Sequence, residues 1–384
     1  MSKYDIAILG AGPAGLAAAR AITGKRVALI DDNPRTGGQI WRAAPQIEIS
    51  PNITFIAAAR VFHITDHFAL HTDRAGIIEA PKLILATGAR ELFVPFPGWT
   101  SPGVFGAGGL QALVKSGLDV KRKRVVVAGS GPLLMAVAAT LRKNGAKVLA
   151  VVEQAPLQRL LAFLKRYPSK LPQALSLKAA LLGVPQITGE WPVKIEGGKV
   201  TLSNGRDFDV DFLACGFGLI PNTEAARLLG CRIDDGFVAV DSKQMTSIPD
   251  VYCAGEPTGI GGLDKALAEG RAAGLAASGL TPPKSPSRAF VRDLAETFRL
   301  DPALAALATP DTIVCRCEDV TRETLDPHRT WREAKLQTRC GMGACQGRIC
   351  GPITAQLYGW RAESVRPPLV PVEAQRLKIA NTGK

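Results

Sequence analysis

The sequence predicts an α/β fold made of two doubly wound βαβ domains and a small helical module at the C-terminal end. Two repeats of one pattern predict the domains. A strand, a glycine-rich turn, a helix and a second strand follow one another at residues 4–32 and again at residues 125–153. The cysteines predict the module, because five of the eight lie between residues 315 and 350.

The bulk composition is that of a globular protein with room for two or three domains, since the chain has 384 residues, 46% of them hydrophobic. A formal charge of +13 indicates a basic surface. Because no nucleic-acid-binding motif accompanies this charge, we expect anionic cofactors and an acidic partner, and no nucleic acid. No apolar run reaches the roughly 18–20 residues of a membrane span, and no signal peptide is recognisable. We therefore expect a cytoplasmic protein, at most peripheral to the inner membrane.

The first βαβ unit carries a complete glycine motif. Residues 4–9 are predicted to form a buried strand, followed by the turn and a helix. The first glycine permits the tight turn, the second lets the backbone approach a pyrophosphate, and the third lets the helix pack closely. The helix N-terminus adds N–H groups and the positive end of a dipole. The predicted phosphate-binding residues are Gly10, Gly12, Pro13, Ala14 and Gly15.

Two acidic residues, Asp31 and Asp32, follow the second strand of this unit, at residues 27–30. A carboxylate at the end of this strand accepts hydrogen bonds from the ribose hydroxyls of a bound nucleotide. We therefore predict that these two residues bind the ribose.

The second βαβ unit repeats the pattern less completely. Gly129 and Gly131 form the turn, and Glu153 ends the following strand. Leu134 stands where the third glycine or alanine belongs, and its side chain is expected to push the helix away from the strand. Two alternatives stay open: a domain without NAD(P)H turnover, or a site for another adenine nucleotide.

Four further segments resemble the two-dinucleotide-domain flavoproteins of the disulfide-reductase type. Residues 31–39 are similar to their adenosine and flavin-approach loop, and residues 83–90 to the strand that ends their first FAD segment. Residues 212–223 are similar to the return from their second domain. Residues 251–256 are similar to their late flavin motif, although Glu256 stands where that motif usually has Asp, so the carboxylate is one methylene longer.

This resemblance implies that the first domain binds FAD. Beyond the glycine turn and its acids, the residues that it assigns to the flavin are Gly38, Gln39, Ala86, Thr87, Gly88, Gly255, Glu256, Gly262 and Leu263. The second domain offers no cysteine pair that could form a redox disulfide against a flavin. Cys215, Cys231 and Cys253 each stand alone in an apolar, strand-like stretch, and we expect buried, inert thiols. Disulfide reductase activity is therefore disfavoured.

The C-terminal cysteines exceed the four thiolates that a 2Fe–2S cluster requires. Cys315 and Cys317 form one pair, and either Cys340 with Cys345 or Cys345 with Cys350 forms the second. The segment resembles the 2Fe–2S module of bacterioferritin-associated ferredoxins, in which the C-Q-G-x-x-C run persists while the position before Gly-Met-Gly is often not cysteine. The resemblance thus favours Cys315, Cys317, Cys345 and Cys350 as ligands, with Cys340 as the alternative. Zinc is the competing metal, but a C-x-C pair fits zinc knuckles poorly.

These features together predict the domain organisation. The predicted parts are an FAD domain at residues 1–105 and 225–280, a second Rossmann-like domain at residues 106–224, a linker and helix at residues 281–310, a 2Fe–2S module at residues 311–362 and an extended tail at residues 363–384.

A substrate-oxidising site is missing from the sequence, since no His/Asp or His/Glu constellation is recognisable. The combination of flavin motifs and cysteine module resembles the FAD-binding large subunit of hetero-oligomeric amino- and imino-acid dehydrogenases, of the hydroxyproline dehydrogenase, opine oxidase and hydrogen cyanide synthase type. That resemblance implies two partners, an oxidase-like FAD subunit and a small ferredoxin-like subunit, with an additional FMN at a subunit boundary. Electrons would pass from the partner flavin through the flavin and the 2Fe–2S cluster of this chain to an external acceptor.

Two other functions remain as alternatives. The second glycine turn and Glu153 would suit an NAD(P)H-dependent flavin and iron–sulfur reductase that acts alone, against which Leu134 counts. A non-enzymatic binding module stabilised by zinc or by a cluster is the third hypothesis.

Overall fold

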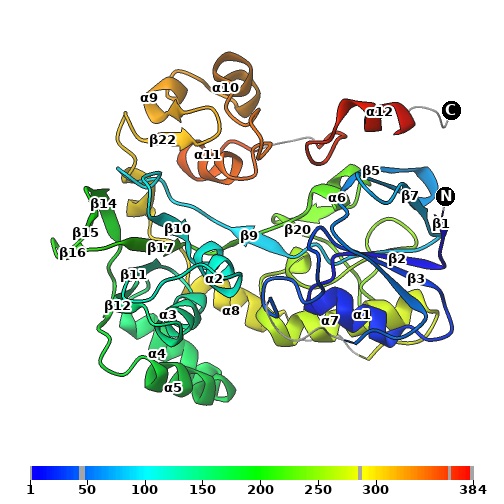
Figure 1. The fold of residues 1–384 in the computed structure, drawn as a ribbon, viewed down its shortest axis with the longest axis horizontal. Helices are drawn as coiled ribbons and strands as arrows, with labels where there is room; N and C mark the ends of the chain where they lie inside the picture. Colours follow the sequence, from blue (N-terminus) through cyan, green and yellow to red (C-terminus); the bar gives the residue numbers. More distant parts are fainter. Residues whose placement is uncertain (1, 43–47, 284–287, 362–364, 381–384) are drawn as a thin grey trace. The chain divides into compact units, whose positions relative to one another are not determined.

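The computed structural model describes residues 2–42, 48–283, 288–361 and 365–380 (Figure 1). The chain divides into two compact units. The first comprises Met1–Arg90, Pro221–Val291 and Glu363–Lys384, and the second comprises Glu91–Ile220 and Arg292–Ala362. Parts of the predicted linker, at residues 284–287, and of the predicted tail, at residues 363–364 and 381–384, lie outside the described residues.

The first unit is built on a five-stranded parallel sheet. Its strands, in spatial order, are β21 (Val251–Cys253), β8 (Leu83–Leu85), β2 (Ile6–Leu9), β3 (Val27–Ile30) and β4 (Ile53–Ile56). Successive residues of a strand point to opposite faces, so Ile6 and Ile8 pack in one core cluster and Ala7 in another. Both faces are therefore buried, which explains why these strands are continuously apolar.

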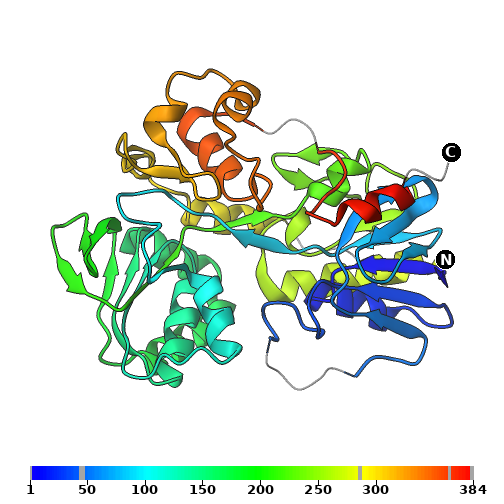
Figure 2. The same cartoon turned by 45° about the horizontal axis from the view of Figure 1, so that its top comes forward.

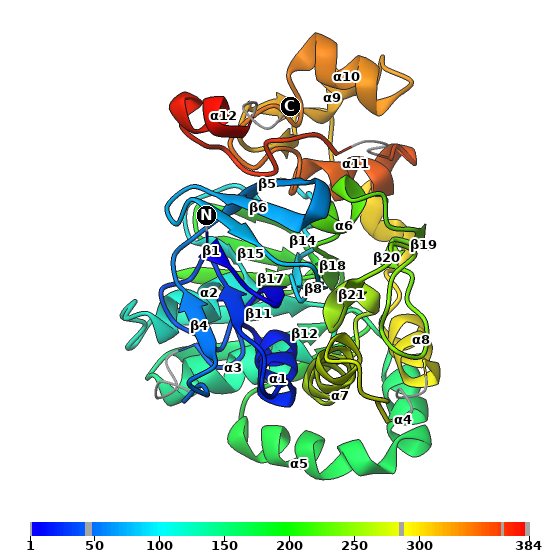
Figure 3. The same cartoon turned by 90° about the vertical axis from the view of Figure 1, so that its right-hand side faces the viewer.

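One face of this sheet is covered by helices α1 (Pro13–Ala21) and α7 (Gly262–Ala277), which lie side by side (Figures 1 and 3). Two glycines of α7 make the close packing possible. A Cβ atom on Gly270 would lie 2.1 Å from the carbonyl oxygen of Ala14, and one on Gly274 would lie 2.3 Å from that of Ala18. The backbones of the two helices therefore approach each other without an intervening side chain.

A second, four-stranded sheet packs on the other face of the parallel sheet. Its strands, in spatial order, are β1 (Ser2–Lys3), β7 (Ile77–Glu79), β6 (Ala69–Thr72) and β5 (Val61–Thr65). The smaller elements of the first unit are η1 (Asp66–Phe68), α6 (Glu224–Leu228), β19 (Ile233–Asp234), β20 (Phe237–Val238), η3 (Glu256–Thr258) and α12 (Ala374–Ala380). The chain leaves this unit within β9 (Ala89–Glu91) and returns within β18 (Leu219–Pro221).

The second unit contains another five-stranded parallel sheet. Its strands, in spatial order, are β10 (Val104–Gly106), β17 (Phe212–Gly216), β11 (Arg124–Gly129), β12 (Lys147–Glu153) and β13 (Gln186–Thr188). Its helices are α2 (Ala107–Lys115), α3 (Leu133–Lys143), α4 (Leu157–Arg166), η2 (Pro168–Lys170) and α5 (Leu171–Ala180). Helices α2 and α3 share a core with one sheet face, and the antiparallel strands β14 (Pro192–Glu196), β15 (Lys199–Leu202) and β16 (Asp207–Asp209) pack on the other. The predicted α/β fold with two dinucleotide-binding domains is thus confirmed.

The cysteine-rich segment completes the second unit and appears in orange in Figure 2. Its elements, with the segment that leads to it, are α8 (Ala289–Thr297), η4 (Pro302–Ala306), β22 (Ile313–Cys315), β23 (Val320–Thr321), α9 (Arg322–Leu325), α10 (Trp331–Thr338) and α11 (Cys350–Tyr358). Val314 and Ile353 belong to the same buried cluster as Val126 and Leu213 of the parallel sheet. The segment therefore shares its core with the second dinucleotide domain. None of the described helices is both long and apolar enough to cross a membrane.

Candidate functional site

The first glycine turn joins β2 to α1 and has the form that a phosphate site requires. Gly10 has φ +108°, and a Cβ atom there would lie 2.2 Å from the carbonyl oxygen of Ala86. A Cβ atom on Gly15 would lie 1.8 Å from the carbonyl oxygen of Gly10, so the turn itself requires both glycines. Among the described residues, the nearest atom to a Cβ position at Gly12, apart from its chain neighbours, is the Gly38 Cα at 4.0 Å. The Gly12 position is therefore less crowded than those of Gly10 and Gly15, and in this motif it is where the backbone approaches a pyrophosphate.

The two acids after β3 differ in their surroundings. Asp31 is buried, and its carboxylate accepts hydrogen bonds from the backbone N–H groups of Ala11, at 2.5 Å, and Asn33, at 2.8 Å. Asp32 is exposed and accepts one hydrogen bond from the Asn33 side chain, at 3.0 Å. Asp31 therefore braces the glycine turn, while Asp32 presents its carboxylate at the rim, where a ribose hydroxyl can reach it.

The loop after β3 contains a residue that sequence reasoning missed. Arg42 donates to the side chain of Gln39 from Nε, at 3.2 Å, and to the side chain of Asn33 from Nη2, at 3.0 Å. Gly38 of the same loop has φ +58°, and its Cβ position lies 3.0 Å from the Gly12 Cα. The loop thus contacts the glycine turn through Gly38, and hydrogen bonds to Gln39 and Asn33 hold the Arg42 guanidinium against the loop.

The A-T-G segment after β8 is fixed by a residue from the return strand. The Thr87 hydroxyl donates to the carbonyl oxygen of Asn222, at 2.6 Å, and the Asn222 side chain donates back to the carbonyl oxygen of Thr87, at 2.8 Å. The Asn222 N–H also donates to the Gly88 carbonyl, at 3.0 Å. Arg90 joins the group by donating to the Asn222 side chain, at 2.7 Å, and by pairing with Glu224, at 2.8 Å. The structure thus brings Thr87 and Gly88 together with the return segment.

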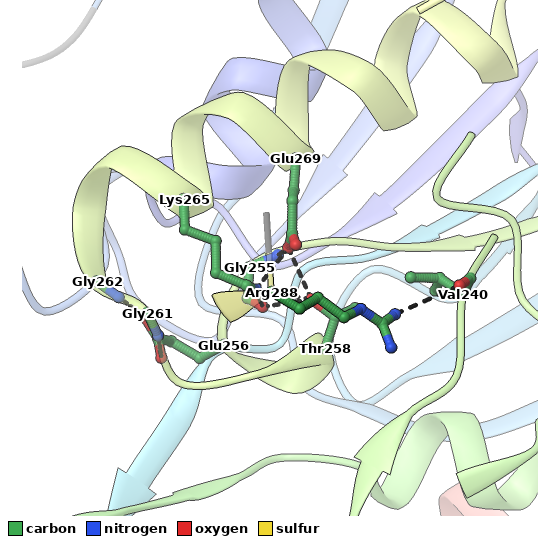
Figure 4. Close-up of polar contacts among 9 residues, drawn as sticks. All are labelled: Val240, Gly255, Glu256, Thr258, Gly261, Gly262, Lys265, Glu269 and Arg288. Atoms are coloured by element: carbon green, nitrogen blue, oxygen red, sulfur yellow. Dashed lines mark hydrogen bonds and ion pairs between the residues drawn. The ribbon is translucent and has the colours of Figure 1, made fainter. Parts of the chain in front are cut away.

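The late flavin motif, drawn in Figure 4, places Glu256 on the N-terminus of α7. Its carboxylate accepts hydrogen bonds from the backbone N–H groups of Gly262, at 2.9 Å, and Gly261, at 3.2 Å. Burial raises the pKa of this carboxyl group, while the Gly262 N–H group opposes the shift. An acid in the first turn of a helix also interacts favourably with the helix dipole. The longer side chain of Glu, compared with Asp, therefore caps α7, whose second residue is the predicted contact Leu263.

A buried ion pair that the sequence did not reveal holds the same motif from the inside (Figure 4). Lys265 Nζ lies 2.7 Å from Glu269 Oε2, and it also donates to the carbonyl oxygen of Gly255 and to the Thr258 hydroxyl, both at 2.8 Å. Glu269 Oε2 accepts from the Gly255 N–H, at 3.0 Å, and from the Thr258 hydroxyl, at 2.6 Å. In the sequence, only the spacing of four residues along a helix indicates that these two side chains can meet.

These residues fit an adenine dinucleotide with a flavin at its far end. The turn itself requires two glycines, the third is less crowded, and the exposed carboxylate of Asp32 follows β3, where the ribose-binding acid of this motif stands. The donors and acceptors therefore suit FAD.

At the second glycine turn the acid folds back onto the turn, as Asp31 does at the first, but the residue that follows it is Gln154 and not a second acid. Glu153 is buried, and its carboxylate accepts from the backbone N–H groups of Gly131, at 2.8 Å, and Ala155, at 2.9 Å. Burial raises the pKa of Glu153 to about 7. Gly129 has φ +139°, and its Cβ position lies 1.9 Å from the carbonyl oxygen of Gly216. This turn therefore requires a glycine at its first position. The Gly131 amide, which a phosphate would need, already donates to a carboxylate of the same chain.

All five C-terminal cysteines lie in the described part of the chain and converge from separate elements. Cys315 ends β22, Cys317 follows it, Cys340 follows α10, Cys345 lies in the loop before α11, and Cys350 begins α11. The Sγ atoms of Cys315, Cys340 and Cys350 all lie within 4.8 Å of one another. These three thiols are buried, whereas Cys345 is half-buried and Cys317 is exposed. The arrangement can hold a metal ion or cluster.

A cavity of about 300 Å³ lies beside these thiols. Its lining includes Cys315, Cys317, Cys345 and Cys350 but not Cys340. Two overlapping sets of thiols can therefore be distinguished. The three thiols whose Sγ atoms lie within 4.8 Å of one another include Cys340, and the four thiols that line the cavity do not. A cluster of two irons and two sulfides needs space as well as thiolates, so the four thiols that line the cavity are the better match.

Hydrogen bonds among the thiols change their acidity. Bonds with Cys340 and then Cys350 lower the pKa of Cys315 to about 2, and a bond with Cys350 lowers the pKa of Cys345 to about 5. The same bonds raise the pKa of Cys350. A lowered pKa favours the thiolate, which is the form that binds metal.

The glycines around the thiols allow close approach. A Cβ atom on Gly343 would lie 2.2 Å from the Cβ atom of Cys317, so only glycine lets the two loops meet. Trp331 packs against Gly341 and Gly347, where Cβ atoms would lie 2.6 Å and 3.2 Å from its ring. Arg348 donates to the carbonyl oxygen of Cys345, at 3.3 Å. Trp331 had no signal in the sequence, because its contact depends on where α10 packs.

The other three cysteines, Cys215, Cys231 and Cys253, are buried as expected from the sequence. Burial raises the pKa of each of these thiols. Cys215 lies in the core cluster that also contains Cys315, Cys340 and Cys350, whereas Cys231 and Cys253 lie in the core of the first unit.

The two dinucleotide-binding domains, with an FAD-compatible site in the first, define an FAD-dependent oxidoreductase. The chain belongs to the pyridine nucleotide-disulphide oxidoreductase family, whose sequence pattern matches residues 4–270. It is 31% identical to hydrogen cyanide synthase subunit HcnB of Pseudomonas aeruginosa, over 89% of this chain and 90% of that protein. It is 30% identical to one subunit of the opine oxidase of Rhizobium meliloti, over 92% of this chain and 81% of that protein. The predicted resemblance to proteins of this type is confirmed.

Solved structures agree on the fold. The crystal structure of L-proline dehydrogenase from P. horikoshii superposes with a TM-score of 0.68 at 20% identity, covering 98% of this chain and 79% of that chain. The thioredoxin reductase of T. acidophilum superposes with a TM-score of 0.57 at 21% identity, covering 73% of this chain and 99% of that chain. Of these two, the former covers the cysteine-rich segment as well as both dinucleotide domains.

Proposed function

We propose that this chain is the electron-transfer subunit of a hetero-oligomeric dehydrogenase that oxidises an amino or imino acid of the hydroxyproline or opine type. It would receive electrons from the flavin of a partner protein and deliver them through FAD and a 2Fe–2S cluster to an external acceptor. The observation that carries this proposal is the convergence of five thiols beside a cavity in a flavoprotein chain. The relatives support it, because they are subunits of an opine oxidase and of a hydrogen cyanide synthase.

The two cofactors divide the chemistry, since FAD accepts an electron pair and can release single electrons, which a 2Fe–2S cluster carries one at a time. The residues of this chain hold and orient them. Gly10, Gly12 and Asp32 would bind the phosphates and ribose of FAD, and Glu256 with the first turn of α7 would meet its flavin end. In the second unit, Cys315, Cys317, Cys345 and Cys350 would bind the two irons.

A partner is part of the proposal because the sequence shows no His/Asp or His/Glu constellation that would suit oxidation of an amine. The partner is an oxidase-like FAD protein, and the assembly that we propose is completed by a small ferredoxin-like protein and by an FMN between the subunits. The chain's formal charge of +13 favours acidic surfaces on the proteins that bind it.

The experiment compares the chain alone with the chain co-purified with an oxidase-like FAD protein as its partner. Dye reduction is measured with L-hydroxyproline, D-hydroxyproline and octopine as substrates. We expect activity only in the complex. Substrate-dependent dye reduction by the chain alone would contradict the partner requirement.

The identity of the metal is tested on the same chain by measurements that do not depend on enzymatic activity. We expect iron and acid-labile sulfide in equal amounts, a brown colour, and a rhombic EPR signal after reduction. A colourless protein with stoichiometric zinc would contradict the cluster and favour a zinc-stabilised module.

The alternative of a self-sufficient NAD(P)H-dependent reductase has less support from the geometry. It requires the second glycine turn to bind a nucleotide, but Glu153 already accepts the N–H of Gly131. Glu153 is therefore turned away from the position in which it would bind a ribose.

A further inference from the structure

The carboxyl edge of the second parallel sheet is covered by the chain itself. A doubly wound sheet binds its dinucleotide at this edge, where here β11 ends at Gly129 and β12 ends at Glu153. We propose that this edge is the docking site for residues 293–302, here called the arm. We further propose that the docked arm prevents the second domain from binding NAD(P)H. The inference uses neither the substrate nor the metal, so it can fail while the proposed function stands.

Three hydrogen bonds join the arm backbone to the two polar residues of this edge. Ser130, in the glycine turn, donates to the carbonyl oxygen of Phe298, at 3.1 Å. Gln154 donates from Nε2 to the carbonyl oxygen of Arg299, at 3.1 Å, and its Oε1 accepts from the N–H of Asp301, at 3.0 Å. A backbone segment therefore lies where the phosphates and ribose of a nucleotide would lie.

The contacts on this edge are buried and mutually satisfied. Ser130 is 4% exposed and Gln154 is 3% exposed, and Gln154 also donates to the Ser130 hydroxyl, at 3.1 Å. Buried polar groups of this kind are costly to leave without partners. A nucleotide would therefore have to replace the arm at both side chains at once.

The arm is anchored at its start by helix α4 and the residue that follows it. Asp293 accepts a hydrogen bond from the Tyr167 hydroxyl, at 2.5 Å, and pairs with Arg166, at 2.8 Å. The ring of Phe298 stands edge-on to that of Phe163, with centroids 6.2 Å apart. Helix α4 and Tyr167 thus hold the start of the arm, and the same helix contacts Phe298 in its middle.

The end of the arm leads into the cysteine-rich segment. Leu304, just beyond it, is fully buried in the core that also contains Val314, Cys315 and Cys340. Trp99 of the second domain donates from its ring N–H to the carbonyl oxygen of Ile313, at 2.7 Å. The docked arm therefore connects the dinucleotide domain to the segment that carries the thiols. The carboxyl edge of the second parallel sheet thus supports that segment.

Electrostatics oppose a nucleotide at the same edge. The carboxylate of Glu153 lies on the N–H of Gly131, which is the amide that a pyrophosphate would need. A phosphate brought to this turn would meet that carboxylate at short range in a poorly solvated site.

The first test uses the intact, cofactor-loaded chain. NADH and NADPH are titrated by calorimetry and, anaerobically, against the flavin absorbance. We expect no saturable binding up to about 1 mM and no bleaching. Saturable binding below that concentration, traced by hydrogen exchange to the turn at residues 129–131, would overturn the proposal.

The second test measures the arm directly by amide hydrogen exchange. Gln154→Ala removes both hydrogen bonds from Gln154 to the arm, so exchange of the Asp301 amide is expected to rise roughly five- to tenfold. Gln111→Ala is the matched control, because Gln111 is likewise buried in the same domain and donates instead to Thr140, at 2.9 Å. An unchanged Asp301 amide in Gln154→Ala, or an equal rise in both variants, would show that the arm is not docked by this residue.

Discussion

Lys265 and Glu269 form a buried ion pair within α7, with Nζ and Oε2 2.7 Å apart, and the same two atoms bind the backbone of Gly255. The pair ties the late flavin motif to the helix that follows it. Because both side chains are almost wholly buried, each charge depends on the other and on the loop for its compensation.

Lys265→Met is expected to destabilise the first unit by about 3 kcal/mol, since it leaves the Glu269 carboxylate buried without its cation. The loop at Gly255 should loosen, and the purified protein should retain less FAD. Thermal unfolding and the flavin-to-protein absorbance ratio measure both effects. The double variant Lys265→Met/Glu269→Gln removes both charges and should recover most of the loss; a double variant as unstable as the single one would contradict this account.

Gly343→Ala is expected to abolish cluster assembly without unfolding the chain. Its added Cβ would lie 2.2 Å from the Cβ of Cys317, so the cysteine must move away from the cavity. Iron content and visible absorbance provide the measurement. Gly351→Ala is the control, because the nearest atom to its Cβ position is 4.0 Å away and the residue lies within α11. Normal iron content in Gly343→Ala would mean that Cys317 is not a ligand.

Cys350→Ser and Cys340→Ser separate the two possible ligand sets. Cys350 lines the cavity, so its replacement should remove the cluster, while Cys340 lies outside the lining and its replacement should leave iron and sulfide in place. EPR of the reduced variants measures the outcome. Cluster loss in Cys340→Ser together with retention in Cys350→Ser would reverse the assignment.

Glu153 should make the stability of the second unit depend on pH. Burial raises its folded pKa to about 7, from an ordinary value of 4.5. Between these values the folded state binds the proton and the unfolded state does not, so stability falls as pH rises from about 4.5 to 7. The difference between the two pKa values corresponds to a decrease in the free energy of unfolding on the order of 3 kcal/mol. This decrease is complete above about pH 7 and absent below about pH 4.5.

Glu153→Gln removes this titration. Unfolding temperatures of the wild-type chain and the variant, compared between pH 5 and pH 8, should differ increasingly in favour of the variant as pH rises. A constant difference across this range would contradict the raised pKa of Glu153.

The sequence was sufficient for the fold class and the family because their signals are local. Gly10 and Gly15 are required by contacts within one turn and its helix, so their spacing is legible in the chain. The A-T-G strand and the late motif likewise occur where the resemblance placed them, in β8 and after β21. The comparisons with known proteins confirm the fold class and the family.

The effect of Leu134 could not be judged from its position in the glycine motif alone. It is buried in the core of the second domain, and its Cδ2 lies 3.5 Å from the Cβ position of Gly216 on the neighbouring strand β17. The missing side chain at Gly216 makes room for it. Compensation between residues so distant in sequence depends on which strands are neighbours.

The sequence by itself determined the two glycine turns, the strands that carry them and the gathering of cysteines, because each depends on residues close together in the chain. The tertiary structure decided which acids are buried against the backbone, as Asp31 and Glu153 are, and which stay exposed, as Asp32 does. Asp31 binds a backbone N–H 20 positions away, and Gln154 binds the arm 145 positions away. Such partners meet only when the sheets are assembled, since packing brings distant segments to the same edge.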